Sequence, residues 1–371
     1  MNFGFPNRSE VQEHRTSVPL NSKIVPNTSI APYMNQEFNV PKPVYPWTTL
    51  QSPFAGTLNE EETKWYDEDY QFLSKEAMAR YKKMRLIDVG PYMVPAATEK
   101  ERVLHATRFA IYMTVTDDYV ELLPIKEIAA FRDRIFEIMM GDDPRPEEKG
   151  ILRQMQANRK EWIALGMPDF WLERIAQNYK YRFVTDGIME ESPYKISKDI
   201  PPIPLFHLIR ANSIGMIPFV DLVCPTTGFA LPDYIYKHTV MQRIIILQSI
   251  IVALQNDFAT IGKELAIESE IFNIITLLQH HNKISFDEAC TEGMRIHDEF
   301  VNEFITLSKH LPDFSPYQKE TVEFIDYIKQ MISGLNDWYY KSGTKRYAPD
   351  GFAVPPNGKG ETMNRIEIKH I

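Results

Sequence analysis

The feature that most constrains this chain is the segment 244–265, whose first half is apolar on every side. A helix that is apolar all round has to be buried among other elements. The apolar part, residues 244–254, is interrupted by Gln248 and Ser249 and is much shorter than the ~20 residues that span a bilayer. We therefore expect a buried central helix and no transmembrane span.

Segments with a helical period follow one another from about residue 59 onward, and no alternating strand pattern competes with them. Residues 59–84 open acidic and close basic, as a helix prefers. The further expected helices are 98–122, 124–140, 146–164, 168–190, 203–215, 232–265, 268–281, 285–310 and 316–341. The pattern predicts one all-α domain over 56–348, between a Pro-rich arm (1–55) and a polar tail (349–371), with two domains as the alternative.

The charge and the cysteine content argue against several classes of function. Lys and Arg total 41 against 50 Asp and Glu, a net charge of −9, which argues against a general nucleic-acid or anionic-membrane binder. The chain has no basic segment followed by an apolar run near its start, so we expect no secretory signal. The two cysteines, Cys224 and Cys290, form no metal or redox motif. These features favour a protein of a reducing compartment, the cytoplasm.

The polar second half of the central helix carries three oxygen ligands on one face. Asn256, Thr260 and Glu264 stand at i, i+4 and i+8, so they drift by only ~80° around the helix axis. An amide, a hydroxyl and a carboxylate suit a hard cation such as Mg²⁺, which completes its shell with water and phosphate oxygens. The plain alternative is a helix that emerges into solvent.

A second cluster, DDYVE at 117–121, closes the expected helix 98–122. Asp117 and Glu121 lie one turn apart on a common face, while Asp118 is rotated by ~100°. Carboxylates this close repel one another, and a divalent cation relieves the repulsion, although an exposed acidic helix end also tolerates it. The two clusters together predict two metal-binding walls that face each other across a helical bundle.

These motifs resemble those of bacterial-type class I terpene synthases, which combine an acidic motif with an Asn/Ser-or-Thr/Glu triad. An arginine that senses the substrate diphosphate precedes the triad in that family, and Arg210 stands 46 residues before Asn256. The resemblance implies that Arg210 is this sensor, that Ser213 is the linker, and that Ile214 is the effector whose carbonyl faces the substrate. It covers about residues 45–350 and implies the class I terpenoid-synthase helical bundle around a central pocket.

Further matches lie beside the triad and near the C-terminus. Lys263 matches the family's diphosphate-contacting lysine, and Arg346 with Tyr347 matches the family's terminal Arg-Tyr pair. The acidic motif ends in Glu instead of Asp, and the triad has Thr instead of Ser. Neither departure removes a required chemical function.

The resemblance implies an enzyme that uses Mg²⁺, with three ions per active site, to ionise a linear prenyl diphosphate and cyclise the carbocation. Farnesyl and geranylgeranyl diphosphate are the favoured substrates, and the resemblance allows a homodimer. An allylic cation needs a dry, electron-rich pocket, and we expect Phe109, Met113 and Trp338 to line it. Phe109 and Met113 precede Asp117 by eight and four residues, so they share its face, but both could equally be core residues.

Two other functions stay open at this point. A chain-elongating prenyltransferase shares the bundle but carries two Asp-rich motifs, whereas this chain has one and the triad. A helical diphosphate-binding protein without turnover would keep the same fold.

Overall fold

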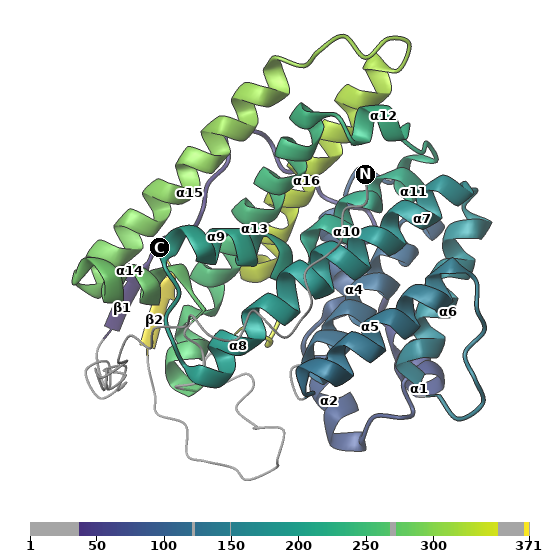
Figure 1. Cartoon of the computed structure of the whole chain (residues 1–371), viewed down its shortest axis with the longest axis horizontal. Helices are drawn as coiled ribbons and strands as arrows, with labels where there is room; N and C mark the ends of the chain where they lie inside the picture. The colour runs from purple at the N-terminus through teal and green to yellow at the C-terminus, as the bar shows by residue number, and fades with distance from the viewer. Residues whose placement is uncertain (1–36, 121–122, 149, 268–271, 348–366, 371) are drawn as a thin grey trace, which may run out of the picture.

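The computed structural model describes residues 37–120, 123–148, 150–267, 272–347 and 367–370, and these are almost entirely helical (Figure 1). The expected all-α class is therefore confirmed. In chain order the helices are α1 (Asn59–Asp69), α2 (Lys75–Lys83), the 3₁₀ turn η1 (Leu86–Asp88), α3 (Val89–Met93), α4 (Glu101–Val120), α5 (Ile125–Met140), α6 (Gly150–Ala164), α7 (Asp169–Gln177), the π-helix η2 (Asn178–Met189), α8 (Glu190–Ser197), α9 (Ile203–Ser213), α10 (Met216–Asp221), α11 (Val223–Thr227), α12 (Asp233–Tyr236), α13 (Thr239–Ile267), α14 (Ile274–Asn282), α15 (Phe286–Lys309) and α16 (Gln318–Lys341).

Several expected helices are subdivided in the structure. The segment 59–84 breaks between α1 and α2 because Ser74 starts a new helix, its hydroxyl accepting the backbone N–H of Ala77. The segment 232–265 divides into α12 and α13, and residues 216–227, which lie between two expected helices, form α10 and α11. The segment 168–190 changes from an α-helix to a π-helix within its length. Short helices that are apolar on all sides show too little periodicity to be recognised.

Helix α13 lies at the centre of one half of the molecule, packed against α9, α10, α14, α15 and α16 (Figure 1). Residues Thr239–Leu265 are apolar and long enough to cross a membrane by length and composition, but 94% of their most apolar window is buried inside the fold. This burial is what the core helix of a soluble protein shows, as the apolar pattern predicts.

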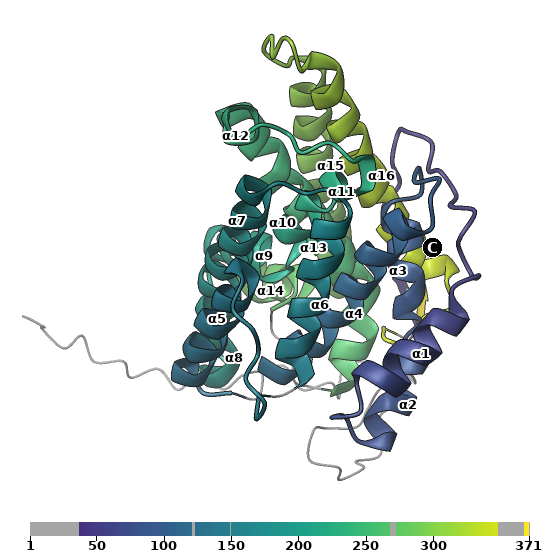
Figure 2. The ribbon, with the colours of Figure 1, turned by 90° about the vertical axis from the view of Figure 1, so that its right-hand side faces the viewer.

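Helix α4 occupies the other half, where it packs against α3, α6 and α11. The halves are joined by α3, which packs on α16, and by η2, which packs on both α5 and α9 (Figure 2). Gly334 of α16 makes the first contact possible, because a Cβ there would lie 1.7 Å from the carbonyl oxygen of Tyr92. The acidic end of α4 and the polar half of α13 thus belong to facing parts of one bundle.

The sequence analysis anticipated no strands, but β1 (Glu37–Val40) pairs in parallel with β2 (Glu367–His370). The arm that follows β1 packs into the bundle instead of remaining apart from it. Tyr45 donates or accepts a 2.9 Å hydrogen bond with His297 of α15, and the indole of Trp47 donates to the carbonyl of Lys329 at 3.0 Å. The other parts of the expected arm and tail, 1–36, 349–366 and 371, lie outside the described residues, so the domain boundaries stay predictions.

Candidate active site

The three triad residues occupy successive turns of α13, as the helical spacing predicts. Asn256 and Glu264 are partly exposed, whereas Thr260 is only 3% exposed. The Thr260 hydroxyl oxygen is buried without a hydrogen-bond partner among the described residues. A buried hydroxyl that makes no such bond is costly, so this oxygen marks a place where a ligand is expected.

Arg210, at the end of α9, reaches α13 next to the triad. Its Nη2 donates to Asn256 Oδ1 at 2.8 Å and to Asp257 Oδ1 at 2.9 Å, and its Nε donates to the same Asp257 oxygen at 3.1 Å. Burial opposes the charge on Arg210, but Asp257, Glu191 and Glu264 outweigh it and raise the pKa of the guanidinium above its usual range. The proposed sensor is therefore a permanent cation beside the triad.

Asp257 is a residue whose role the sequence analysis missed. It is fully buried, and besides Arg210 it accepts the backbone N–H of Ile274 at 2.9 Å. Burial raises the pKa of Asp257 to about 6, although Arg210 and this N–H oppose the rise. A fully buried carboxylate needs a cation, and Asp257 belongs to a helix that the sequence predicts to be buried, so a cationic partner could have been expected.

The acidic wall lies on the last turns of α4. Asp118 accepts from Arg346 Nη2 at 3.0 Å and from the hydroxyl of Tyr81, on α2, at 2.6 Å. Asp117 lies farther from Arg346, at 4.0 Å. Glu121, the third expected ligand, lies outside the described residues.

Charges from several elements converge on Asp118. Burial opposes its ionisation, but Arg346 and the Tyr81 hydrogen bond outweigh burial and hold the pKa of Asp118 below its usual range. Lys263 of α13 also lowers the pKa of Asp118 through its positive charge.

The C-terminal segment that carries Arg346 and Tyr347 links the two walls. The Thr344 hydroxyl donates to the carbonyl of Met84 at 2.6 Å and docks the segment beside α2. The Tyr347 ring lies 5.1 Å from the ring of Tyr339, whose hydroxyl accepts from Asn256 Nδ2 at 3.3 Å. Arg346 therefore contacts α4, while its neighbour Tyr347 is linked to the triad through Tyr339.

The expected linker and effector lie at the junction of α9 and α10. Ser213 ends α9, Ile214 follows, and Gly215 begins the next helix with φ of +75°, a left-handed conformation that glycine adopts without strain. A Cβ on Gly215 would lie 3.0 Å from Met113 Cε, so Met113 packs directly beside this turn. Gly187 of the π-helix packs closely against the same turn. A Cβ on Gly187 would lie 2.7 Å from the backbone nitrogen of Ser213.

The two expected aromatic pocket residues have different surroundings. Phe109 is fully buried, with its ring 5.5 Å from Trp162 and 5.1 Å from Phe219, as the core alternative describes. Trp338 donates its indole N–H to the carbonyl of Arg85 at 3.3 Å and lies edge-on to Tyr347 at 5.7 Å. Of the two, only Trp338 touches the residues of the site.

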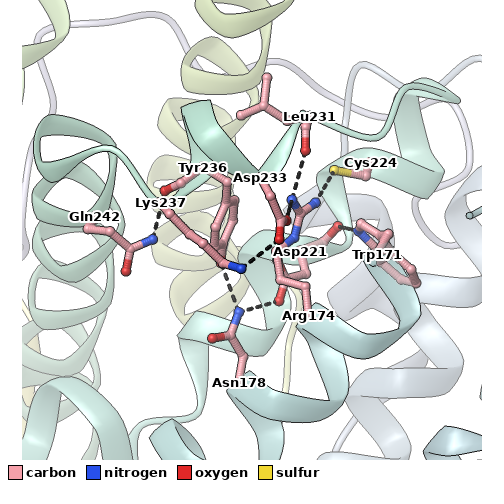
Figure 3. A network of polar contacts seen from close by, with 10 residues as sticks. All are labelled: Trp171, Arg174, Asn178, Asp221, Cys224, Leu231, Asp233, Tyr236, Lys237 and Gln242. Atoms are coloured by element: carbon pink, nitrogen blue, oxygen red, sulfur yellow. Dashed lines mark hydrogen bonds and ion pairs between the residues drawn. The ribbon is translucent and has the colours of Figure 1, made fainter. Parts of the chain in front are cut away.

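A second buried polar network supports α10 from the end opposite to the Ile214 turn (Figure 3). Arg174 of α7 lies 3.3 Å from Asp221, the last residue of α10, and stacks on the ring of Tyr236 at 4.2 Å. Asn178 donates to Asp221 at 2.7 Å, and Arg174 contacts the sulfur of Cys224 at 3.4 Å (Figure 3). Cys224 is fully buried in this network and forms no disulfide.

Comparison with known families identifies the architecture. The model of the terpene synthase family 2, C-terminal metal-binding domain, matches residues 108–303, which is more than half of the chain and includes both walls. The chain belongs to this terpene synthase family. Its description includes metal binding, in agreement with the two clusters of oxygen ligands.

Individual terpene synthases are similar over most of their length. Germacrene A synthase of Nostoc punctiforme is 22% identical over 308 residues, covering 80% of this chain and 92% of that protein. A (-)-beta-caryophyllene synthase of Saccharothrix espanaensis, described as cyclising (2E,6E)-farnesyl diphosphate, is 23% identical over 315 residues, covering 82% and 88%. The crystal structure of an α-eudesmol synthase superposes with a TM-score of 0.69 at 18% identity, covering 80% of this chain and 98% of that one. The structural likeness confirms the expected terpene synthase fold.

The residues of the terpene synthase site fit a divalent cation by their chemistry. Carboxylate, amide and hydroxyl oxygens are the ligands of hard cations, and both walls provide them. The unpartnered Thr260 hydroxyl lies between Asn256 and Glu264, one turn from each, and would gain the partner that it lacks. The site therefore has oxygen ligands suited to a divalent cation and, among the described residues, a buried Thr260 hydroxyl without a hydrogen-bond partner.

Proposed function

We propose that this chain is a Mg²⁺-dependent terpene cyclase that ionises a linear prenyl diphosphate and cyclises the allylic cation to a terpene hydrocarbon or alcohol. The observation that supports the proposal most is the chain of contacts that joins Asp118 to the triad. Arg346 of the C-terminal segment donates to this carboxylate, and its neighbour Tyr347 packs on Tyr339, whose hydroxyl accepts from the triad residue Asn256. Arg210 of α9 also donates to Asn256, so oxygen ligands from two walls and guanidinium donors from two segments lie along one chain of contacts, as a metal-bound diphosphate requires.

Each group has a part in this chemistry. Asp117 and Asp118, with Glu121, would hold Mg²⁺ on one wall, and Asn256, Thr260 and Glu264 would hold it on the other, three ions in all. When bound, the ions supply positive charge that neutralises the departing diphosphate. Cationic and hydroxyl donors bind the diphosphate oxygens as the C–O bond breaks and its electron pair leaves with the oxygen: Arg210, Lys263, Arg346 and Tyr347.

The allylic cation that remains needs a surface that excludes water and orients its chain. The carbonyl of Ile214 faces the cation in this proposal, held by Ser213 and the close approach of Gly187. Met113 lies beside the same turn. Loss of a proton or capture of water ends the reaction.

Farnesyl diphosphate is the favoured substrate, with geranylgeranyl diphosphate as the longer alternative. The relative from Saccharothrix espanaensis, which is described as cyclising farnesyl diphosphate, supports this choice. We place the reaction in the cytoplasm because neither cysteine takes part in a disulfide.

The test is incubation of the purified chain with Mg²⁺ and, separately, geranyl, farnesyl and geranylgeranyl diphosphate, followed by gas chromatography and mass spectrometry of the extract. Glu264→Ala is the inactive variant, and Glu299→Ala, an exposed glutamate of α15 paired with Arg295, is the matched control. The proposal expects a cyclic product that needs metal, disappears in Glu264→Ala and persists in Glu299→Ala.

Two other results would contradict cyclisation. Longer prenyl diphosphates formed only when isopentenyl diphosphate is added would indicate a prenyltransferase. Binding of inorganic diphosphate with Mg²⁺ but no product from any substrate would indicate a protein without turnover.

A further inference from the structure

Asn273, the residue that precedes α14, is fully buried and uses its side chain in two directions. Its Oδ1 accepts the backbone N–H of Ile275 at 2.9 Å, which makes it the N-cap of α14. Its Nδ2 points back to α13, where it donates to the carbonyl of Asp257 at 2.9 Å and to Glu264 Oε2 at 2.7 Å. One side chain thus joins the start of α14 to two points on the triad helix.

The cap alone does not explain an asparagine at this position. Aspartate and serine cap helices about as well, because only an acceptor oxygen is needed. The Nδ2 group carries two N–H donors, and both have acceptors on α13. Those acceptors are seven residues apart, about two helical turns, so Nδ2 lies against the face of α13 that carries Glu264.

The turn at Asn273 and Ile274 is also linked to Arg210, the proposed diphosphate sensor. Ile274, next to Asn273, donates its backbone N–H to Asp257 Oδ2, and the other oxygen of Asp257 accepts from Arg210. The first turn of α14 therefore contacts both the carboxylate that holds Arg210 and the last ligand of the triad. A displacement of this turn would move the two groups together.

We propose that Asn273 is a positioning residue that orients the Glu264 carboxylate for binding of the divalent cation. The inference rests on the proposed metal-dependent function. A carboxylate on a flexible side chain has to be held to bind an ion with fixed geometry, and hydrogen bonds to ligating carboxylates serve this purpose. Since the Asn273 amide is neutral, it orients Glu264 without placing a positive charge in competition with the metal.

Asn273→Asp tests this role because it separates the two directions of the side chain. The aspartate keeps an acceptor for the Ile275 N–H, so the cap remains. It replaces the donor to Glu264 by a second carboxylate, which repels Glu264. Asn273→Ser is the uncharged second variant, since serine also caps but is too short to bridge to α13.

The readout is the Mg²⁺ concentration that gives half of the thermal stabilisation produced by Mg²⁺ with inorganic diphosphate, measured on the full chain without turnover. We expect both variants to need roughly 10–100-fold more Mg²⁺ than the unmodified chain, the usual cost of losing a group that orients a metal ligand. Ser285→Ala removes the N-cap of α15, which a capping box closes, and serves as the control for a merely structural change. It should lower the melting temperature and leave the Mg²⁺ midpoint unchanged.

Unchanged Mg²⁺ midpoints in both Asn273 variants, with stabilisation of the unmodified chain intact, would overturn the positioning role alone. A shift in Ser285→Ala as large as in the Asn273 variants would also overturn it, because any loss of a cap would then suffice. If the unmodified chain showed no stabilisation by Mg²⁺ with diphosphate, the proposed function would fail first, and the inference with it.

Discussion

The two walls of the site are held in different ways. On α13, the triad is fixed by neighbouring elements: Arg210 of α9 bonds Asn256 and Asp257 at one end, and Asn273 bonds Glu264 at the other. On α4, Asp118 is held by a guanidinium that arrives from the C-terminal segment, at Arg346. On each wall a guanidinium occupies a ligand oxygen that a metal ion would need: Arg346 at Asp118, and Arg210 at Asn256. The walls differ in where that guanidinium comes from: a helix of the bundle, α9, at the triad, and the C-terminal segment at the acidic wall.

The largest expected effect on stability concerns the buried pair Arg210–Asp257 beside the triad. Arg210→Met leaves the fully buried Asp257 carboxylate without its cation, which costs about 3–5 kcal/mol in the free energy of unfolding. Urea unfolding at pH 7 measures this loss. Adding Asp257→Asn should recover stability without recovering diphosphate binding, because the buried charge is gone but the sensor is still absent. A loss below about 1 kcal/mol in Arg210→Met would mean that the triad wall is not arranged by this pair.

The equivalent change on the acidic wall acts on turnover. Arg346→Gln removes a donor to the leaving diphosphate, and we expect kcat to fall on the order of 100-fold. Because Asp118 is only partly buried, the free energy of unfolding should change by less than about 1 kcal/mol. Steady-state kinetics and urea unfolding of the same preparation separate the effects. A stability loss as large as that of Arg210→Met would remove the distinction between the walls.

A buried histidine on α4 should make the stability of the fold depend on pH. Burial lowers the pKa of His105, on α4, to about 3. The unfolded chain takes up a proton below about pH 6.5 that the folded chain refuses, so stability falls as the pH drops from 6.5 toward 3. Between pH 6.5 and 5 the loss is about 2 kcal/mol. His105→Gln should remove this loss of stability in acid. An identical pH dependence of the free energy of unfolding in His105→Gln and in the unmodified chain would contradict the role given to His105.

The smallest expected effect concerns the tyrosine on the acidic wall. Tyr81→Phe removes the 2.6 Å hydrogen bond to Asp118 while Arg346 remains in place. We expect a loss of about 1 kcal/mol in stability and a slightly higher Mg²⁺ midpoint. Tyr340→Phe, a tyrosine of α16, is the comparison variant. Equal Mg²⁺ midpoints for Tyr81→Phe and the unmodified chain would show that Arg346 alone holds Asp118.

The helical bundle and the triad were predictable because helix periodicity is local. Spacing alone puts Asn256, Thr260 and Glu264 on one face, and the apolar half of the same helix predicts its burial. Arg210 followed from the resemblance and not from its spacing, since nothing local says that α9 packs on α13.

The partners of these ligands were not predictable from the sequence. Tyr81 and Asn273 reach the site only because α2 and α14 fold against α4 and α13, which no local pattern encodes. Helical spacing also paired Asp117 with Glu121 and rotated Asp118 away, yet Asp118 is the residue that Arg346 contacts most closely. Tertiary packing sets the position of a partner residue, and this position determines which carboxylate the partner contacts.

The account rests on metal ions bridging the two walls, and one measurement tests this directly. Crystals of the full chain grown with Mn²⁺ and inorganic diphosphate would locate the metal by its anomalous scattering. The account predicts Mn²⁺ within bonding distance of Asn256, Thr260 and Glu264 and also at the acidic end of α4, with diphosphate between them and Arg210 among its donors. Diphosphate bound with no metal at the triad, or with metal only elsewhere on the protein, would contradict it.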